Sequence, residues 1–162
     1  MLCFARAKKV SFWKIADIVT TVCTPGIFLG RLAKFVNGEL WGKISDVPWA
    51  MIFPRSAAAG TAVENIAARH PSQLYEAFAE GLLIFAFLQW RFWRGNLPKG
   101  RIAGEFLSLY AVVRIVCEIF REPDAGVEPI LGLSRGTFYS VLTLVAGLAI
   151  IAYSKFSNSA QK

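Results

Sequence analysis

Four apolar stretches, each long enough to form a membrane-spanning helix, constrain this chain more than any other feature of its sequence. They cover residues 15–33, 74–92, 103–120 and 136–153, and the last of them contains no charged side chain. A helix of about 20 apolar residues crosses the hydrocarbon core of a bilayer. Because 55% of the residues are also hydrophobic, the sequence predicts an all-α fold, a multi-pass transmembrane helical bundle of about four spans.

The basic residues predict how such a bundle is oriented. A net charge of +7 would also fit a nucleic-acid-binding protein, but the placement of the charges favours a membrane protein. Basic side chains cluster before the first span, between the second and third, and after the last, and these three segments share one side of a four-helix path. By the positive-inside bias that side is the cytoplasm, so both termini are predicted to be cytoplasmic. The alternative is that basic residues only decorate the loops. The residues concerned are Arg6, Lys8, Lys9, Lys14, Arg91, Arg94, Lys99, Arg101, Lys155 and Lys162.

The opposite side then receives residues 34–72, one long extracytoplasmic loop between the first two spans, and a shorter loop over residues 121–135. Glycines and prolines interrupt the long loop, and loops of this length are usually functional or disordered. Its tryptophans argue against disorder and suit the interface between membrane and water. Acidic residues collect on this side: Glu39, Asp46, Glu64, Glu122, Asp124 and Glu128.

The cysteines and the amino terminus exclude two simpler interpretations. Cys3, Cys23 and Cys117 are dispersed without CxxC spacing, so the sequence indicates neither a disulfide framework nor a zinc site. The basic and then apolar start resembles a secretory signal, but no small-x-small cleavage site follows it. We therefore expect the first apolar stretch to remain as a span.

One polar stripe crosses the third predicted span. At 100° per residue, Tyr110, Arg114, Glu118 and Arg121 fall within one arc of the helix. Arg114 and Glu118 are four residues apart, the spacing at which helical side chains meet. A charge at the middle of a bilayer costs about 3 kcal/mol, so the stripe should face a protein interior or a wet cavity. It is either part of a functional site or an ion pair that only fixes helix packing.

Two further clusters lie near span ends. Arg31 lies at the end of the first span, and Asn37 and Glu39 lie in a turn beyond it. The Arg31 guanidinium is suited to bind a phospholipid phosphate. The alternative is that Arg31 only snorkels to the interface, as arginines at this depth also do. The segment RHPSQLYEA contains His70, the only histidine, which is either a structural hydrogen-bonding partner or a base. Ser72 is predicted to cap the following helix, and Glu76 suits the dipole of its first turn.

The order of GRLAKFVNGELWG, RHPSQLYEA and YAVVRIVCEIFREPD closely resembles the carboxy-terminal part of bacterial prolipoprotein diacylglyceryl transferases. The resemblance covers nearly all of the chain and implies the last four spans of a seven-span protein of the bacterial plasma membrane. It implies transfer of the diacylglyceryl group of phosphatidylglycerol to the lipobox cysteine thiol in a prolipoprotein signal peptide. Glycerol phosphate would be released, and neither a metal nor an organic cofactor would be required.

The resemblance also implies roles for individual residues. It implies that Arg31 binds phosphatidylglycerol and that Glu39, Gly42 and the polar stripe of Tyr110, Arg114 and Glu118 line the lipid site. We therefore predict that Arg31, Asn37, Glu39 and Gly42 bind phosphatidylglycerol, and that Tyr110, Arg114, Glu118 and His70 are catalytic. A thiol with a pKa near 8.5 must lose its proton, and a departing phosphate needs positive charge. His70 and Glu118 are the two candidates for the group that accepts the thiol proton.

The sequence departs from the family pattern in two respects. Ala33 and Lys34 stand where the pattern GRxGNFxN has glycine and asparagine, so Lys34 adds a cation in place of a neutral amide. The earlier spans of the family and their His-Gly-Gly motif are not present in this sequence. We therefore predict a truncated transferase whose bundle is completed by the missing amino-terminal half or by a second copy. Two other hypotheses stay open: an inactive remnant that binds lipid or signal peptides, and a structural membrane subunit.

Overall fold

The regular elements of the chain are helices throughout the part that is described. The computed structural model describes residues 1–123, 128 and 130–159, so two charged residues named above, Asp124 and Lys162, lie outside the described residues. The all-α fold predicted from the sequence is confirmed for the described residues. The elements in chain order are α1 (Leu2–Ala7), α2 (Phe12–Val36), η1 (Pro54–Ser56), η2 (Val63–Asn65), α3 (Ser72–Glu76), η3 (Ala77–Leu83), α4 (Ile84–Arg94), α5 (Arg101–Glu118) and α6 (Arg135–Ser159).

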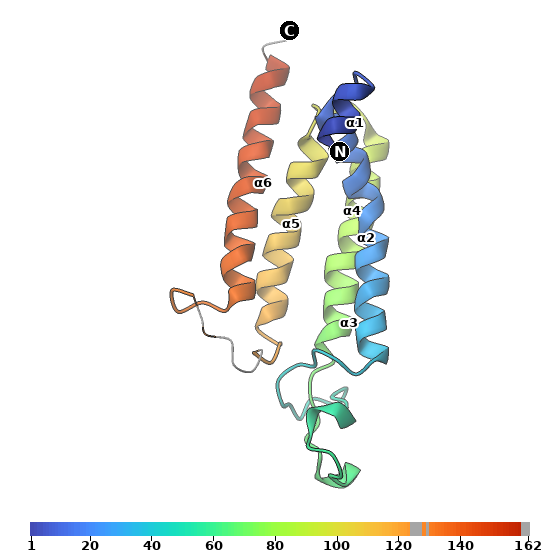
Figure 1. Ribbon diagram of the computed structural model, residues 1–162, viewed down its shortest axis with the longest axis vertical. Helices are drawn as coiled ribbons and strands as arrows, with labels where there is room; N and C mark the ends of the chain where they lie inside the picture. The colour runs from blue at the N-terminus through green and yellow to red at the C-terminus, as the bar shows by residue number, and fades with distance from the viewer. Residues whose placement is uncertain (124–127, 129, 160–162) are drawn as a thin grey trace.

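Four long helical segments form an elongated bundle, and both chain ends lie at the same end of it (Figure 1). The elements α3, η3 and α4 follow one another without a break and act as one segment beside α2 and α5. Each long segment contains most of one predicted span. Two helices, Phe12–Val36 and Arg135–Ser157, are long and apolar enough to cross a membrane. Four crossings therefore remain a prediction.

Small residues let the helices approach closely in two places. A Cβ atom on Gly147 of α6 would lie 2.5 Å from Ser108 Oγ and 3.0 Å from the carbonyl oxygen of Gly104, both on α5. A Cβ atom on Gly81 of η3 would lie 2.6 Å from the Cβ atom of Phe28 on α2. Close contact through small residues is typical of helices that associate in membranes, where packing replaces the hydrophobic effect as the driving force.

The end of the bundle that carries the termini is fixed by polar contacts. Asp17 of α2 accepts hydrogen bonds from the backbone N–H groups of Gly100 (2.7 Å) and Ala103 (2.8 Å), so it caps the first turn of α5 from a neighbouring helix. Glu105 of α5 lies 2.7 Å from Arg91 Nη2 and 2.7 Å from Arg101 Nε. These contacts hold the connection between α4 and α5 against α2.

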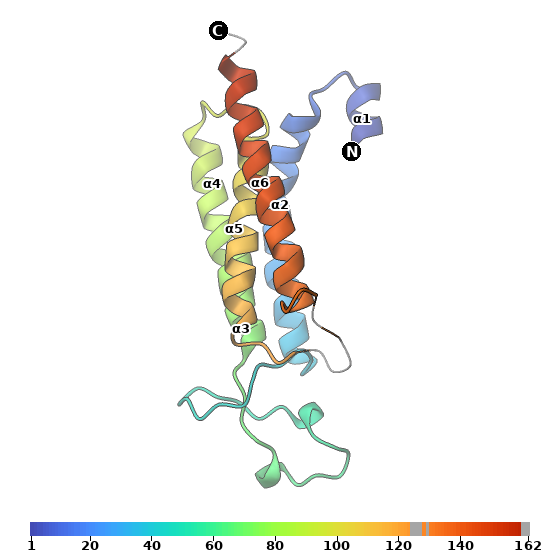
Figure 2. The same cartoon turned by 90° about the vertical axis from the view of Figure 1, so that its left-hand side faces the viewer.

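At the opposite end, the segment between α2 and α3 extends beyond the helices (Figure 2). Isolated bridges join Gly42 to Arg121 and Arg69 to both Ile44 and Met51, so this segment is tied to the end of α5. Ser72 does not cap α3 with its side chain, and the prediction that it does is wrong. Its buried hydroxyl instead donates to the carbonyl oxygen of Leu40 at 3.1 Å, because the incoming segment packs directly against the start of the helix.

Large apolar side chains cover the outer surface of the two most apolar helices. Only 11% of each 18-residue apolar window on α2 and α6 is buried. Val22 and Leu29 on α2, and Val145 and Leu148 on α6, are each more than half exposed. Such a continuous apolar surface requires lipid or another protein around it.

Candidate functional site

Five charged side chains meet inside the bundle, and together they form what we call the charged cluster. Arg31 comes from α2, Glu76 and Glu80 come from α3 and η3, and Arg114 and Glu118 come from α5. Both glutamates of the second segment are almost fully buried, with 2% and 0% of their side chains exposed. The two arginine side chains are 13% and 11% exposed. A group of charges at this depth must be mutually neutralised, because isolated ions are costly to remove from water.

Glu76 is the bridge between the two arginines. Its Oε2 atom lies 2.8 Å from Arg31 Nη1, and its Oε1 atom lies 2.6 Å from Arg114 Nη1. The two guanidinium groups, which would otherwise repel one another, therefore share a carboxylate between them. Charge-assisted pairs of this length are among the stronger hydrogen bonds in proteins.

Glu80 forms the second link between the same arginines. Its Oε2 atom accepts from Arg31 Nε at 3.2 Å and from Arg31 Nη2 at 2.9 Å, and its Oε1 atom lies 3.5 Å from Arg114 Nη1. Glu80 belongs to the π-helix over Ala77–Leu83, a widened turn that is rare and frequently found at functional sites. The adjoining Gly81 lets this widened segment pack against Phe28 on α2.

Glu118 lies at the edge of the cluster and is oriented by the start of α6. Its Oε2 atom is 3.3 Å from Arg114 Nη2, which confirms that this pair meets, as the spacing of four residues predicted. Its Oε1 atom accepts a hydrogen bond from Ser134 Oγ at 2.8 Å. A Cβ atom on Gly136 would lie 2.7 Å from Glu118 Oε1, so a larger residue there would displace the carboxylate from this position.

Tyr110 completes the polar stripe of α5 and lies next to the charged cluster. Its phenol interacts electrostatically with Arg31, Glu80 and Arg114. The predicted stripe therefore does face the protein interior over Tyr110, Arg114 and Glu118. Arg121 departs from this arrangement, because α5 ends at Glu118 and Arg121 forms a bridge with Gly42 instead.

His70 lies in a second, largely apolar environment beside the cluster. Its Nδ1 atom is 3.1 Å from the hydroxyl of Tyr75, which also accepts a hydrogen bond from Trp49 Nε1 at 2.7 Å. The His70 ring packs edge-on against both Tyr75 and Phe120, with centroid distances of 5.9 and 5.4 Å. A cavity of about 510 Å³ opens here, which we call the apolar hollow. It is lined by Trp49, His70, Leu74, Tyr75, Phe78, Ala79, Val116, Cys117 and Phe120.

The three predicted residues of the turn after α2 lie outside the charged cluster. The carbonyl oxygen of Asn37 accepts from Arg55 Nη1 at 2.8 Å, and the exposed Glu39 carboxylate is 3.8 Å from the same nitrogen. Gly42 is buried, and its N–H donates to the carbonyl oxygen of His70 at 2.9 Å. A Cβ atom there would lie 2.6 Å from the carbonyl oxygens of His70 and Phe120, so Gly42 holds two parts of the site together.

Glu76 and Glu80 are the members of the cluster that the sequence reasoning missed. Glu76 was predicted only to suit the dipole of the first turn, which is wrong because α3 has no acidic residue in its first turn, and Glu80 received no role. A signal was nevertheless present, because both carboxylates fall inside a predicted span, four residues apart. Ionisable residues within a span face the bundle interior and mark sites far more often than they decorate a surface.

The charged cluster combines two chemical capacities in one place. The guanidinium groups present several N–H donors toward an anion such as a phosphate. The carboxylates balance that charge and are able to accept a proton. The apolar hollow is adjacent, because its lining residue Cys117 interacts electrostatically with Glu80, Glu76, Arg114 and Arg31 of the charged cluster.

Comparisons with known proteins identify the family of this chain. The family described as "Prolipoprotein diacylglyceryl transferase" matches residues 1–153. Curated relatives named phosphatidylglycerol--prolipoprotein diacylglyceryl transferase are 42% identical in Sinorhizobium medicae, 42% in Pseudoalteromonas translucida and 45% in Zymomonas mobilis. The alignments cover 99%, 98% and 90% of this chain, but 56%, 56% and 50% of the relatives. The chain thus spans about half the length of the curated relatives it matches.

Proposed function

This chain belongs to the prolipoprotein diacylglyceryl transferase family, and from that premise we propose that it transfers the diacylglyceryl group of phosphatidylglycerol to the lipobox cysteine of prolipoproteins. The observation that carries the proposal is the charged cluster, in which Arg31, Arg114 and Glu118 meet within a helical bundle. Those residues are the ones that the family resemblance assigns to the lipid site. The partners are phosphatidylglycerol, a prolipoprotein signal peptide and the membrane, with a separate amino-terminal half or a second copy against the exposed apolar faces.

The arrangement of the helices supports a four-span topology in the bacterial inner membrane. Both chain ends and the connection between α4 and α5 lie at one end of the bundle (Figure 1). The basic residues that flank the spans belong to these segments, so this end is proposed to be cytoplasmic. The single membrane domain then places its extracytoplasmic loop, residues 34–72, and the charged cluster toward the outer half of the bilayer, where the donor lipid and the signal peptide meet.

We place the phosphate of phosphatidylglycerol against Arg31 and Arg114. A phosphate diester carries one negative charge, so it competes with the carboxylates that already hold these arginines. Arg114 contacts Glu76 at 2.6 Å, Glu118 at 3.3 Å and Glu80 at 3.5 Å, and the Glu118 side chain is the most exposed of the three carboxylates, at 16% against 2% and 0%. The Glu118 pair is therefore the one that opens when phosphate binds, which leaves Glu118 beside the substrate.

The released carboxylate is then positioned to take part in the reaction. Glu118 accepts the proton of the lipobox thiol, and His70 is the second candidate for that role. The thiolate sulfur forms a bond to the glyceryl carbon while the bond from that carbon to the phosphate ester oxygen breaks. Both electrons of the broken bond leave with glycerol phosphate, whose negative charge the two arginines stabilise. Tyr110, next to Arg31, helps to hold the phosphate.

The apolar hollow supplies a place for an acyl chain of the donor lipid. Its walls are almost entirely apolar, and it adjoins Glu76 and Glu118, so a lipid whose phosphate lies in the cluster has an acyl chain within reach of it. Asn37, Glu39 and Gly42 are proposed to shape the entrance for the head group, since Gly42 anchors the loop to His70.

Filling the apolar hollow should slow transfer without disturbing the charged cluster. Ala79→Trp places an indole where the acyl chain is expected to lie, so we expect about a tenfold loss of transfer, comparable to the loss of one or two buried methylene contacts. Ala86→Trp is the matched control, because Ala86 is exposed on α4 away from the hollow. Transfer rates with lipids of different chain length give the readout. An equal loss in both variants would contradict the assignment.

The proposal itself is tested by measuring transfer directly. The 162-residue chain is reconstituted in liposomes with labelled phosphatidylglycerol and a lipobox peptide, and labelled peptide is quantified. A peptide whose lipobox cysteine is replaced by serine is the control, because its hydroxyl is a much poorer nucleophile than a thiolate. Label on the cysteine peptide alone is the expected result. No transfer by the folded chain, either alone or together with an added amino-terminal half from a family member, would overturn the proposed activity.

A further inference from the structure

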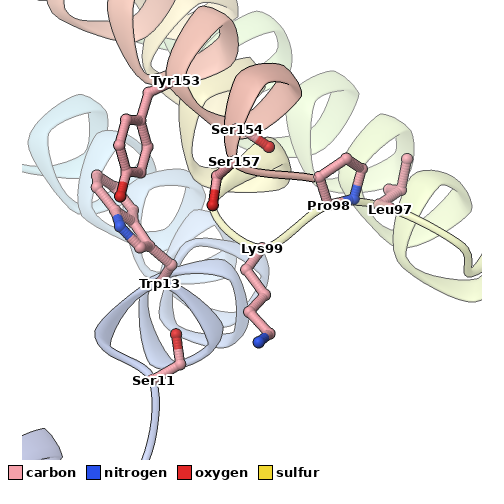
Figure 3. A pocket seen from close by; sticks show the side chains of 8 residues that line it. All are labelled: Ser11, Trp13, Leu97, Pro98, Lys99, Tyr153, Ser154 and Ser157. Atoms are coloured by element: carbon pink, nitrogen blue, oxygen red, sulfur yellow. The ribbon is translucent and has the colours of Figure 1, made fainter. Parts of the chain in front are cut away.

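A second hollow lies at the end of the bundle that carries the termini, far along the helices from the charged cluster. Figure 3 shows that three separate segments build it: the start of α2, the connection between α4 and α5, and the end of α6. Its volume is about 270 Å³. We call it the terminal hollow, and its polar and aromatic lining comprises Ser11, Trp13, Lys99, Tyr153, Ser154 and Ser157.

The polar groups of the terminal hollow are suited to an anion. The hydroxyls of Ser11 and Ser157 and the ammonium of Lys99 face the same opening (Figure 3). Among the described residues that line the hollow, Lys99 is the only charged one, so no carboxylate in this described lining neutralises it. Hydroxyls and an ammonium are hydrogen-bond donors that phosphate oxygens accept.

A buried hydroxyl in the lining has no partner within the described chain. Ser154 is 1% exposed, and its Oγ atom makes no hydrogen bond with any described residue. Serines inside helices commonly donate to a carbonyl one turn earlier, as Ser140 does to Gly136 on the same helix. A buried polar group left unpaired is unfavourable, so a bound acceptor at Ser154 would remove that penalty.

The walls of the terminal hollow are held in place by packing. The rings of Trp13 and Tyr153 lie 5.6 Å apart. A Cβ atom on Gly100 would lie 2.8 Å from Trp13 Cε3, and the φ angle of Gly100 is +85°, a conformation that favours glycine. Trp and Tyr gather at the level of lipid head groups in membrane proteins. The walls of the terminal hollow are therefore fixed by packing, and the hollow lies at the level expected for a lipid head group.

We propose that the terminal hollow binds the phosphate of an anionic phospholipid head group, at the opposite membrane face from the charged cluster. Lys99 pairs with the phosphate, and the hydroxyls of Ser154 and Ser157 donate to its oxygens, while Trp13 and Tyr153 border the glycerol backbone. The surrounding basic residues at this end, among them Lys8 and Lys14, attract anionic lipids to it. The lipid would fasten α6 to the connection between α4 and α5.

Native mass spectrometry of the whole chain in detergent tests this site, with phosphatidic acid as the probe and phosphatidylcholine of the same acyl chains for comparison. Lys99→Gln should weaken phosphatidic acid binding about tenfold, as expected for the loss of one charge-assisted pair. Ser154→Ala should weaken it about fivefold. Phosphatidylcholine binding and diacylglyceryl transfer should not change in either variant, which separates this site from the charged cluster.

Lys8→Gln is the matched control, since it removes the same charge at the same end without altering the lining. Equal losses in Lys8→Gln and Lys99→Gln would show that general electrostatic attraction, and not a site, holds the lipid, and would overturn the proposal. Inorganic phosphate alone is the second comparison. If it bound as tightly as phosphatidic acid and depended equally on Lys99, the ligand would be a soluble phosphate and the lipid assignment would be wrong.

Discussion

Glu76→Gln is expected to lower the free energy of unfolding of this chain by about 3 kcal/mol, the cost of removing one partner from a buried ion pair. Glu76 is 2% exposed and lies within 2.8 Å of Arg31 and 2.6 Å of Arg114. Glutamine keeps the size of the side chain but not its charge, so two guanidinium groups would face each other across a neutral amide. Glu80 alone would then have to hold both arginines, and its contact with Arg114 is 3.5 Å.

Glu105→Gln offers a matched control for the Glu76 substitution. Glu105 also joins two arginines, Arg91 and Arg101, but its side chain is 11% exposed and lies at the end of the bundle that carries the termini. Water and salt screen that pair more effectively, so we expect a smaller loss of stability. Unfolding is followed by circular dichroism in mixed micelles. A larger loss for Glu105→Gln than for Glu76→Gln would show that the charged cluster is not the more tightly coupled network.

The parts of the fold that depend on local periodicity could be predicted from the sequence. Long apolar stretches became long helical segments, because helix formation in a nonpolar medium satisfies the backbone within each segment. The contact between Arg114 and Glu118 followed from helical spacing and is confirmed at 3.3 Å. The proximity of Arg31 to this pair could not be predicted from helical spacing, because eighty-odd residues separate them in the chain.

The parts that depend on tertiary packing could not be predicted. No local pattern predicts the π-helix over Ala77–Leu83, in which Gly81 packs closely against Phe28. Serine is a preferred capping residue, yet the Ser72 hydroxyl donates its hydrogen bond to the carbonyl oxygen of Leu40 instead. His70 could be identified as unusual but not located, because its ring contacts come from Tyr75 and from Phe120, fifty residues further along the chain.

Arg114→Ala is expected to reduce diacylglyceryl transfer about a hundredfold or more, the effect of losing a group that stabilises developing negative charge. Arg114 is the one residue that contacts Glu76, Glu80 and Glu118 within the described cluster, and in the proposed reaction it holds the leaving phosphate. Alanine removes that charge and leaves the carboxylates to repel both each other and the phosphate of the donor lipid.

Arg114→Lys distinguishes a loss of chemistry from a loss of folding. Lysine retains the positive charge, so the cluster should stay folded, but its single ammonium cannot bridge Glu76 and Glu118 as two separate guanidinium nitrogens do. We expect normal circular dichroism with transfer still reduced at least tenfold, the effect of about 1.4 kcal/mol of lost transition-state stabilisation. Arg91→Ala, which breaks a comparable pair with Glu105, is the control and should retain most of its activity. Full activity in Arg114→Lys would mean that only the charge at this position matters, and that the separate contacts of the two Arg114 guanidinium nitrogens are not needed for transfer.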